Sequence, residues 1–209
     1  MKGIFITIEG GDGAGKTTQI KNITDYFESR GIEVIKTREP GGTEIGEKIR
    51  NILLDKDNIE MTSVAEMFLY ASARAQLVRE VVIPALAEKK VVICDRFVDS
   101  SIAYQGYARN LGRIVEEVNK YATRELEPDI TFWLDIDPDK GKLRAGNIGE
   151  HDRIESETSS FHADVRRGYR EIEKKYPNRV KRIDAEKSIG EMSREIKDYL
   201  DELCKKREI

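Results

Sequence analysis

The sequence predicts one α/β domain built on a five-stranded parallel sheet with helices on both faces. Short runs rich in Ile, Val, Phe and Trp alternate with longer amphipathic stretches along the chain, and this alternation favours a parallel sheet covered on both sides. A glycine-rich motif follows the first apolar run directly. No Pro/Ser-rich linker and no internal repeat divides the 209 residues, a length that suits one domain with a sizeable core. We therefore expect residues 1–209 to form a single domain.

Short length and β-branched or aromatic residues mark the apolar runs as strands. They are GIFITIEG, EVIKTR, KVVICDR, DITFWLDI and RVKRIDA. Helical periodicity occupies about 16–30, 43–54, 63–88, 111–125, 137–146, 155–175 and 188–206. Phe68, in the third of these helices, is expected to face the core. The glycine-rich segment AGNIGEH is predicted to be a mobile loop, within a lid at about 144–154.

Charge and cysteine content argue against several classes of protein. The 36 Lys and Arg residues nearly balance the 39 Asp and Glu residues, for a net charge of −3, so we expect no nucleic-acid partner and no membrane surface. Cys94 and Cys204 form no CxxC pattern, and His151 and His162 lack metal-ligand spacing, which speaks against a disulfide framework or a zinc site. With no signal-peptide pattern and no apolar run of membrane length, we expect a reduced, soluble, cytoplasmic protein.

The stretch GGDGAGKT fits the phosphate-loop pattern G-x-x-x-x-G-K-[ST]. Glycines let backbone N–H groups turn toward phosphate oxygens, and the helix that follows adds its positive N-terminal end. Lys16 is expected to reach the β- and γ-phosphates, and Thr17 to ligate Mg²⁺. The motif lies between a predicted strand and a predicted helix, as it requires. The donor-nucleotide residues are thus predicted to be Gly10, Gly11, Asp12, Gly13, Ala14, Gly15, Lys16, Thr17 and Thr18.

A second nucleotide signal is the apolar run VVICD, which ends in Asp95. A carboxylate at the end of a strand beside a phosphate loop can orient Mg²⁺ through water. Glu9, just before the first glycine, is a weaker candidate for contact with the metal or with Arg96. The guanine-reading pattern N-K-x-D is not present, NKYA being the nearest approach, and an ATPase motor would need a longer chain. The remaining hypothesis is a small phosphotransferase.

Four further stretches carry a family resemblance: TREPGGTEIG, AEMFLYASARAQLV, DRFVDSSIAYQG and GEHDRIE. Together with the phosphate loop they resemble the thymidylate kinase family in its bacterial form, from Ile4 to about Asp184. The resemblance implies a nucleoside-monophosphate kinase of the P-loop NTPase fold, with ATP and Mg²⁺ as cofactors, dTMP as acceptor, dTDP as product and a homodimer. The alternatives are a kinase for UMP/CMP or a deoxynucleoside, or a nucleotide-binding regulator without activity.

Three arginines from separate motifs are expected to share one electrostatic role: Arg38, Arg74 and Arg96. A donor triphosphate and an acceptor monophosphate repel each other, so guanidinium groups are needed to bring them together. The second pKa of a phosphate monoester is about 6, so the acceptor oxygen is already anionic and no general base is required. Catalysis can then rest on positioning and charge neutralisation.

The resemblance also implies roles for the residues of the acceptor pocket. Tyr70 would pack on thymine, and Arg74, one helical turn later, would read a base carbonyl. Ser101 would lie near the imide edge of the base. Tyr104 would crowd the 2′ position of the sugar and favour deoxyribose, and Gln105 would support the same pocket.

The lid departs from the family pattern. Bacterial enzymes of this kind place several arginines in the lid, but Gly146 and Ile148 occupy two of the positions that can be arginine. Arg153 is therefore the first candidate for the charge that bridges donor and acceptor in the transition state, and Arg144 the second. His151 is expected to be a solvated loop residue.

Two expectations remain for the donor side. Asp12 would repel phosphate if it pointed into its own loop, so it is expected to face Mg²⁺, an arginine or a sugar hydroxyl, beside the acceptor. The adenine of ATP is expected near Ala185, after the last strand. Should the lid arginines prove inactive, Arg166 and Arg167 are the next candidates.

Overall fold

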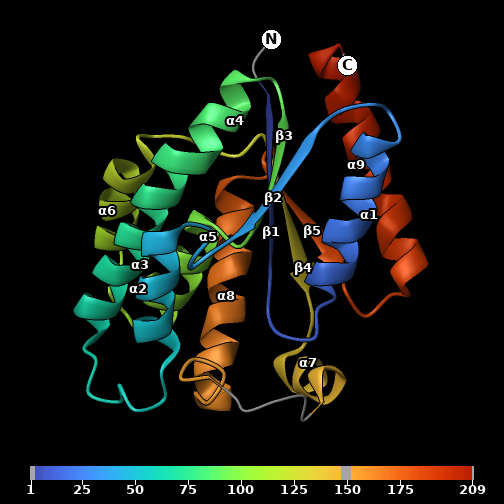
Figure 1. Cartoon of the computed structure of the whole chain (residues 1–209). Coiled ribbons are helices and arrows are strands. Elements are labelled where there is room, and N and C mark those ends of the chain that lie inside the picture. The colour runs from blue at the N-terminus through green and yellow to red at the C-terminus, as the bar shows by residue number, and fades with distance from the viewer. Residues whose placement is uncertain (1–2, 147–151, 209) are drawn as a thin grey trace.

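The structure, a computed structural model, describes residues 3–146 and 152–208 (Figure 1). Its sheet consists of β1 (Ile4–Gly10), β2 (Val34–Arg38), β3 (Val91–Asp95), β4 (Ile130–Asp135) and β5 (Val180–Asp184). The strand order is β2-β3-β1-β4-β5, and every neighbouring pair is parallel. The predicted five-stranded parallel sheet is therefore confirmed, and each strand lies within its predicted run.

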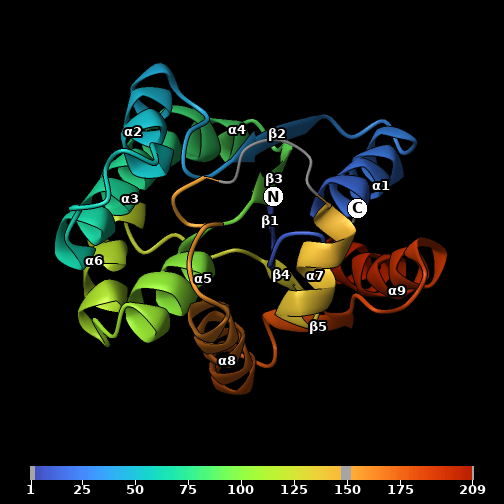
Figure 2. The same cartoon turned by 90° about the horizontal axis from the view of Figure 1, so that it is seen from below.

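Helices cover both faces of the sheet (Figures 1 and 2). The side chains of Ile4, Ile6 and Ile8 pack on one face with α1 (Lys16–Glu28) and α9 (Ile189–Arg207). Phe5, between them, points to the opposite core, as the two-residue period of a strand requires. The remaining helices are α2 (Glu44–Leu54), α3 (Ser63–Leu77), α4 (Ile83–Ala87), α5 (Val98–Ser101), α6 (Ile114–Thr123), α7 (Pro138–Ala145) and α8 (Ser159–Lys175).

Two segments among these helices are π-helical, which the sequence did not predict. η1 (Val78–Val82) connects α3 to α4, so the predicted helix at 63–88 is one continuous helical path of three kinds of turn. η2 (Ile102–Ala108) continues α5 through a stretch in which the sequence predicts no helix. It packs tightly on α8, where a Cβ added to Gly168 would lie 2.9 Å from the Cα of Ala103. The packing of η2 against α8 therefore determines the conformation of this segment.

The expectation for Phe68 was wrong, because its side chain is 53% exposed. The buried residues of α3 include Met67, Ala71, Arg74 and Leu77. Residues 3–146 and 152–208 contain no helix that is long and apolar enough to cross a membrane.

The carboxyl ends of the parallel strands meet at one edge of the sheet, at the bottom of Figure 1. β1 leads there into the phosphate loop, and β3 ends there at Asp95. Ligands of open parallel sheets bind at this edge. α7 lies across it, as the view from below shows (Figure 2).

Candidate active site

A cavity of about 670 Å³ opens at this edge of the sheet. It brings together the phosphate loop, the end of β2, α3, the α5–η2 segment and both described ends of the predicted lid. Most of the residues chosen from the sequence line it: Asp12, Gly13, Gly15, Lys16, Thr17, Thr18, Arg38, Tyr70, Arg74, Asp95, Arg96, Ser101, Tyr104, Gln105 and Arg144.

Lys16 is the first residue of α1, and its side chain folds back onto the phosphate loop. Its ammonium group donates to the carbonyl oxygens of Gly10 at 3.1 Å and Gly11 at 2.9 Å. Burial, and then the nearby Arg96 charge, lower the pKa of Lys16 to about 8. Gly13 has φ +69°, and a Cβ there would lie 2.1 Å from the carbonyl oxygen of Gly141 in α7. Only glycine lets the loop approach α7 this closely.

Asp95 and Thr17 fit a magnesium ion. One carboxylate oxygen of Asp95, Oδ1, is buried and has no hydrogen-bond partner within the described part of the chain. Thr17 follows Lys16 and lines the same cavity. Hydroxyl and carboxylate oxygens are ligands that Mg²⁺ accepts, together with water and phosphate. These residues would therefore hold the ion between them, with the Asp95 contact through water.

Glu9, the weaker metal candidate, is engaged by protein donors. Its carboxylate accepts from the Phe97 N–H at 2.7 Å, the Ser100 hydroxyl at 2.5 Å and the Tyr169 hydroxyl at 2.9 Å. Burial, and then repulsion from Asp99, raise the pKa of Glu9 to about 7. In this geometry Glu9 fastens the turn after β3 to β1 and α8.

Arg96 lines the cavity and has an unusual backbone conformation. Its φ of 68° lies in the left-handed region, which is costly for a residue with a side chain. Its Nη2 is 3.5 Å from Oδ1 of Asp12, and its guanidinium carbon lies 5.4 Å from the centre of the Tyr104 ring. Asp12 thus lies beside an arginine, one of the three neighbours that the sequence allowed.

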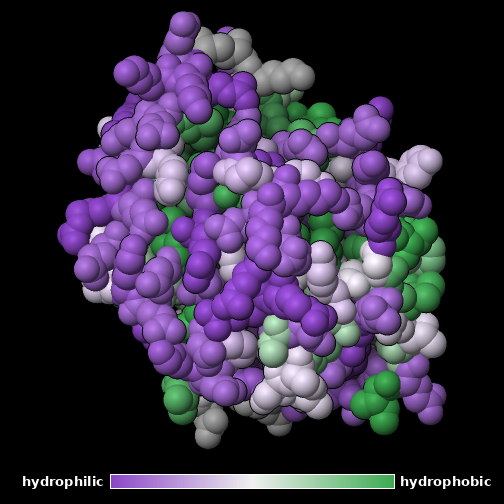
Figure 3. All heavy atoms as spheres, turned by 180° about the vertical axis from the view of Figure 1, so that it is seen from behind, coloured by the Kyte–Doolittle hydropathy of each residue, from purple (hydrophilic) through white to green (hydrophobic). Residues whose placement is uncertain are grey.

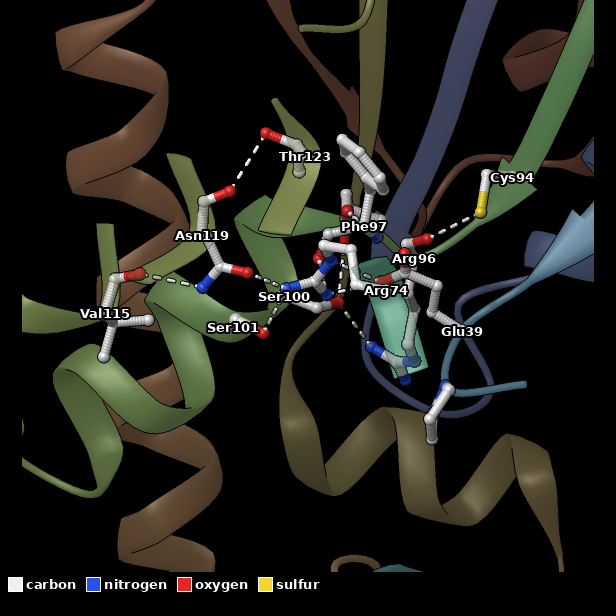
Figure 4. Close-up of polar contacts among 12 residues, drawn as sticks. Glu39, Arg74, Cys94, Arg96, Phe97, Ser100, Ser101, Val115, Asn119 and Thr123 are labelled. Carbon is white, nitrogen blue, oxygen red and sulfur yellow. Dashed lines mark hydrogen bonds and ion pairs between the residues drawn. The ribbon is translucent and has the colours of Figure 1, made fainter. Parts of the chain in front are cut away.

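Arg74 is almost completely buried, and its guanidinium is surrounded by acceptors (Figure 4). Nε donates to Oε2 of Glu39 at 2.7 Å, Nη1 to Oγ of Ser101 at 2.9 Å, and Nη2 to the Phe97 carbonyl at 2.9 Å. Nη1 also donates to Oδ1 of Asn119, and Nη2 to Glu39. Sequence reasoning missed Glu39 and Asn119. Glu39 lies within the quoted REPGGT stretch, whereas nothing in the local sequence marks Asn119.

The other residues predicted for the acceptor pocket line the same cavity as this arginine. Tyr70 lies one turn before Arg74 on α3, and burial raises the pKa of its hydroxyl. Tyr104 is buried and meets Phe161 edge to face, with ring centres 6.1 Å apart. Arg38 also lines the cavity, is half exposed and pairs with Glu47 at 2.9 Å.

Arg153 is tied to α2 and α3 and does not belong to the residues that line the cavity. Its Nε donates to the Leu53 carbonyl at 2.9 Å, and its Nη2 lies 2.7 Å from the Glu66 carboxylate. Glu66, also missed from the sequence, is buried and accepts from Arg109 at 3.1 Å and Gln105 at 2.8 Å.

Burial alone would raise the pKa of Glu66, but the hydrogen bonds from Arg109 and Gln105 and the positive charges outweigh it, so the pKa is lowered. The carboxylate is therefore held in its charged form. Residues 152–157, which follow the predicted lid, are joined to this cluster through Arg153 and through the pair of Arg109 with Glu157 at 2.6 Å.

Arg144, by contrast, lines the cavity near the phosphate loop. Its guanidinium donates to the carbonyl of Ala185, the residue expected near the adenine. Ala185 itself is fully buried. The predicted lid is described at residues 144–146 and 152–154, and Ile148 and His151 lie outside the described residues.

Comparison with known proteins gives a consistent result. Residues 8–196 match the protein-family model described as thymidylate kinase. The chain is 47% identical over 204 residues to the thymidylate kinase of Clostridium novyi (strain NT), covering 95% of this chain and 98% of that one. It is 49% identical over 201 residues to the thymidylate kinase of Thermoanaerobacter sp. (strain X514), covering 96% and 98%. The crystal structure of thymidylate kinase from Ehrlichia chaffeensis superposes with a TM-score of 0.77 at 34% identity, covering 96% and 99%.

Proposed function

The chain belongs to the thymidylate kinase family, and we propose that it transfers the γ-phosphate of ATP to dTMP, giving dTDP. The observation that carries the proposal is one cavity that holds both a phosphate loop and the wall formed by Tyr70, Arg74 and Ser101. Relatives that match nearly the whole chain carry the same name, so a UMP/CMP kinase or an inactive regulator is not favoured.

On the donor side, the loop and its lysine account for triphosphate binding. The N-terminal end of α1 and the ammonium group of Lys16 face the position of the β- and γ-phosphates. Mg²⁺, held by Thr17 and Asp95, would neutralise part of the charge that the phosphates bring. Because phosphoryl transfer depends mainly on positioning and electrostatics, these groups supply much of the chemistry.

On the acceptor side, Arg96 and Arg38 both line the cavity and offer positive charge there. We propose that Arg96 binds the phosphate of dTMP, and that Asp12, 3.5 Å away, keeps its guanidinium aligned. The acceptor oxygen attacks as an anion, so no side chain has to remove a proton. The charge that develops between the two substrates is met by arginines, for which Arg144 at the phosphate end is one source.

We also propose a homodimer. Large apolar side chains are exposed on neighbouring surfaces of α2, α3 and α6, and hydrophobic atoms gather along the right-hand edge of Figure 3, the side on which α3 and α6 lie. Such patches on a soluble protein mark interaction sites. The residues of this apolar surface are Ile45, Ile52, Val64, Phe68, Ile114 and Tyr121.

We place the enzyme in the cytoplasm, where ATP is abundant. Cys94 and Cys204 are both free thiols and both buried, which suits a reducing compartment.

The test is a coupled assay of ADP release with dTMP, dUMP, UMP, CMP, AMP and GMP as acceptors. We expect the highest kcat/KM with dTMP, a preference of up to about tenfold over dUMP for one buried methyl group, and a larger preference over CMP. A Lys16→Ala variant purified in the same way excludes a contaminating kinase. Equal kcat/KM for dTMP and CMP contradicts the proposed acceptor, and no ADP release with any acceptor contradicts the kinase activity.

A further inference from the structure

The segment from Arg96 to Gln105 contributes to the walls of two separate cavities, and no described residue lines both. The active-site cavity is lined by Arg96, Ser100, Ser101, Tyr104 and Gln105. The second cavity, of about 310 Å³, is lined by Phe97, Val98, Asp99 and Ile102, together with residues of α6, of the loop before β4 and of the chain that follows α8. Contacts on the side of the second cavity therefore help to set where this wall of the active site lies.

On that side, Arg179 holds Asp99 by two parallel hydrogen bonds. Nη1 of Arg179 donates to Oδ2 of Asp99 at 2.6 Å, and Nη2 donates to Oδ1 at 2.9 Å. Asp99 is 3% exposed, and a two-bond pairing of this kind also fixes the direction of both side chains. Nη1 further donates to the Thr131 hydroxyl at 2.8 Å, which pairs with that of Thr7 at 2.7 Å. Since Thr7 and Thr131 are opposite residues of β1 and β4, Asp99 is tied to the sheet.

α5 depends on such contacts, because it has only four residues and its N-cap residue, Phe97, offers no side-chain hydrogen bond. A helix this short is not stable by itself. On the side of the active site, Glu9 accepts from the Phe97 N–H and from the Ser100 hydroxyl. Ser100 follows Asp99 directly, and its Oγ accepts from Nη1 of Arg96 at 3.4 Å. A shift of α5 therefore changes the position of the Arg96 guanidinium.

Arg179 also balances the charge around α5. Glu9 and Asp99 are both buried and repel each other, and Arg179 attracts both carboxylates. Without Arg179, Asp99 would be a buried charge with no opposite charge bound to it, which is costly. Its carboxylate would gain hydration by moving into the second cavity, and α5 would move with it.

We propose that Asp99 and Arg179 are positioning residues for Arg96: their ion pair holds α5 where Ser100 keeps the Arg96 guanidinium at the acceptor phosphate. The proposal rests on the function proposed above and deepens it. Neither residue belongs to the described lining of the active-site cavity, so both act through α5 and touch no substrate. Their effect should therefore appear in the binding of the acceptor, with equal size for dTMP and dUMP, and not in the binding of ATP.

The experiment measures kcat and the KM values for dTMP and ATP in the wild type, Arg179→Ala, Arg96→Ala and the double variant. We expect Arg179→Ala to raise the KM for dTMP by about tenfold, the effect of a small misplacement of a binding group. The KM for ATP and the dTMP/dUMP ratio of kcat/KM should stay unchanged. In the Arg96→Ala background, Arg179→Ala should change kcat/KM for dTMP no further. A loss of stability alone would lower the active fraction, and thus the apparent kcat, without raising one KM.

The matched control is Arg207→Ala. Arg207 pairs with Asp129, whose carboxylate accepts from the Phe5 N–H at 2.8 Å, so this pair also ties a helix to β1. It belongs to α9, which covers the other face of the sheet. Arg207→Ala should lower the melting temperature and leave both KM values unchanged.

A folded Arg179→Ala variant with the wild-type KM for dTMP would overturn the proposal, as would independent, multiplicative effects of Arg179→Ala and Arg96→Ala. If Arg179→Ala does not fold, Asp99→Asn/Arg179→Met decides, because it breaks the pair without leaving a buried charge. It should raise the KM for dTMP alone, and an unchanged KM there overturns the proposal. A wild type that does not phosphorylate dTMP contradicts the proposed function instead, so the two failures are distinct.

Discussion

Arg96 combines a strained backbone conformation with a proposed role in binding the acceptor phosphate. Its left-handed φ of 68° turns the side chain toward Asp12 and Tyr104. A protein tolerates such a conformation where the surroundings enforce it. Here Cys94 donates to the Arg96 carbonyl at 3.0 Å, and the Arg96 N–H donates to the Ile8 carbonyl at 2.9 Å, so the neighbouring strands hold the strained residue in place.

We expect Arg96→Ala to fold and to lose ~2–4 kcal/mol of transition-state stabilisation, because charge-assisted contacts to the acceptor phosphate disappear. The measurement is kcat/KM for dTMP, with folding checked by circular dichroism. Arg182→Ala is the control, since Arg182 is half exposed and pairs with Asp135. If both variants kept wild-type kcat/KM, Arg96 would be a structural ion-pair residue.

The lid arginines give a second prediction. From the sequence, Arg153 came before Arg144 as the source of transition-state charge, and that ranking is untested. The contacts make us expect the reverse, because Arg153 is bound to Glu66 and Leu53 whereas Arg144 lines the cavity. Arg144→Ala should lower kcat by about 10²-fold or more with little change in KM for dTMP.

Arg153→Ala should instead lower the melting temperature and leave kcat within a few fold. Steady-state kinetics and thermal unfolding of the two variants, prepared side by side, separate the roles. A larger kcat loss in Arg153→Ala would mean that its pairing with Glu66 breaks when the substrates bind.

Single side chains show where sequence reasoning stops. The phosphate loop could be found because its residues follow one another in the sequence, and Asp95 because it ends a short apolar run. Asn119 and Glu66 could not, because each acts on a partner brought near by tertiary packing: Asn119 meets Arg74, 45 residues away, and Glu66 meets Arg109, 43 residues away.

At the scale of elements, β1, β3 and β4 could be predicted because each is a buried apolar run. The edge strands β2 and β5 are less buried, but their short runs of β-branched residues still favour strands. η2 could not be predicted. Its sequence IAYQGYA has no clear helical period and contains a glycine, and its π-helical path depends on close packing against Gly168 of α8. The prediction that Phe68 is buried was wrong for a related reason. Residue type favours the core for a phenylalanine, but the packing of α3 decides which face of the helix is covered.

Glu66 links three elements, α3, η2 and the segment after the lid, and yields a prediction about pH. Because its pKa is lowered in the folded state, the stability that it contributes is complete above the unfolded pKa and is lost as the pH falls through the folded pKa. The groups that face it are Arg109, Arg153, Gln105 and Tyr70.

Glu66→Gln should reduce the free energy of unfolding by ~1–3 kcal/mol at neutral pH. The difference from the wild type should shrink as the pH falls below the ordinary glutamate range. Urea unfolding between pH 3.5 and 7 measures it. Glu44→Gln is the control, since its ion pair with Lys48 is exposed and such pairs contribute little. A difference that stays constant with pH would show that the loss comes from packing alone.

At the scale of the whole molecule, the helices on the two faces of the sheet differ in how much apolar surface they expose. α1 and α9 close one face over a continuous apolar core. On the other face, α2, α3 and α6 keep large apolar side chains at the outer surface, on the side opposite α1 and α9 in Figure 1. The active-site cavity lies between these halves, bounded by α3 and by the phosphate loop. An interface on α3 would therefore contact the helix that carries Tyr70 and Arg74.

Phe68 is the residue with which to test that interface. It lies on the outer face of α3, between Val64 and the turn that carries Ser72. If the apolar surface forms a dimer, Phe68→Lys places a charge in the contact, and the desolvation cost should raise the dissociation constant by at least about tenfold. Sedimentation velocity across a concentration series measures it. Ile189→Lys is the control, because Ile189 is similarly exposed but begins α9 on the opposite side of the molecule. A wild type that sediments as a monomer at all concentrations, or a Phe68→Lys variant that dimerises as tightly as Ile189→Lys, would remove α3 from the interface.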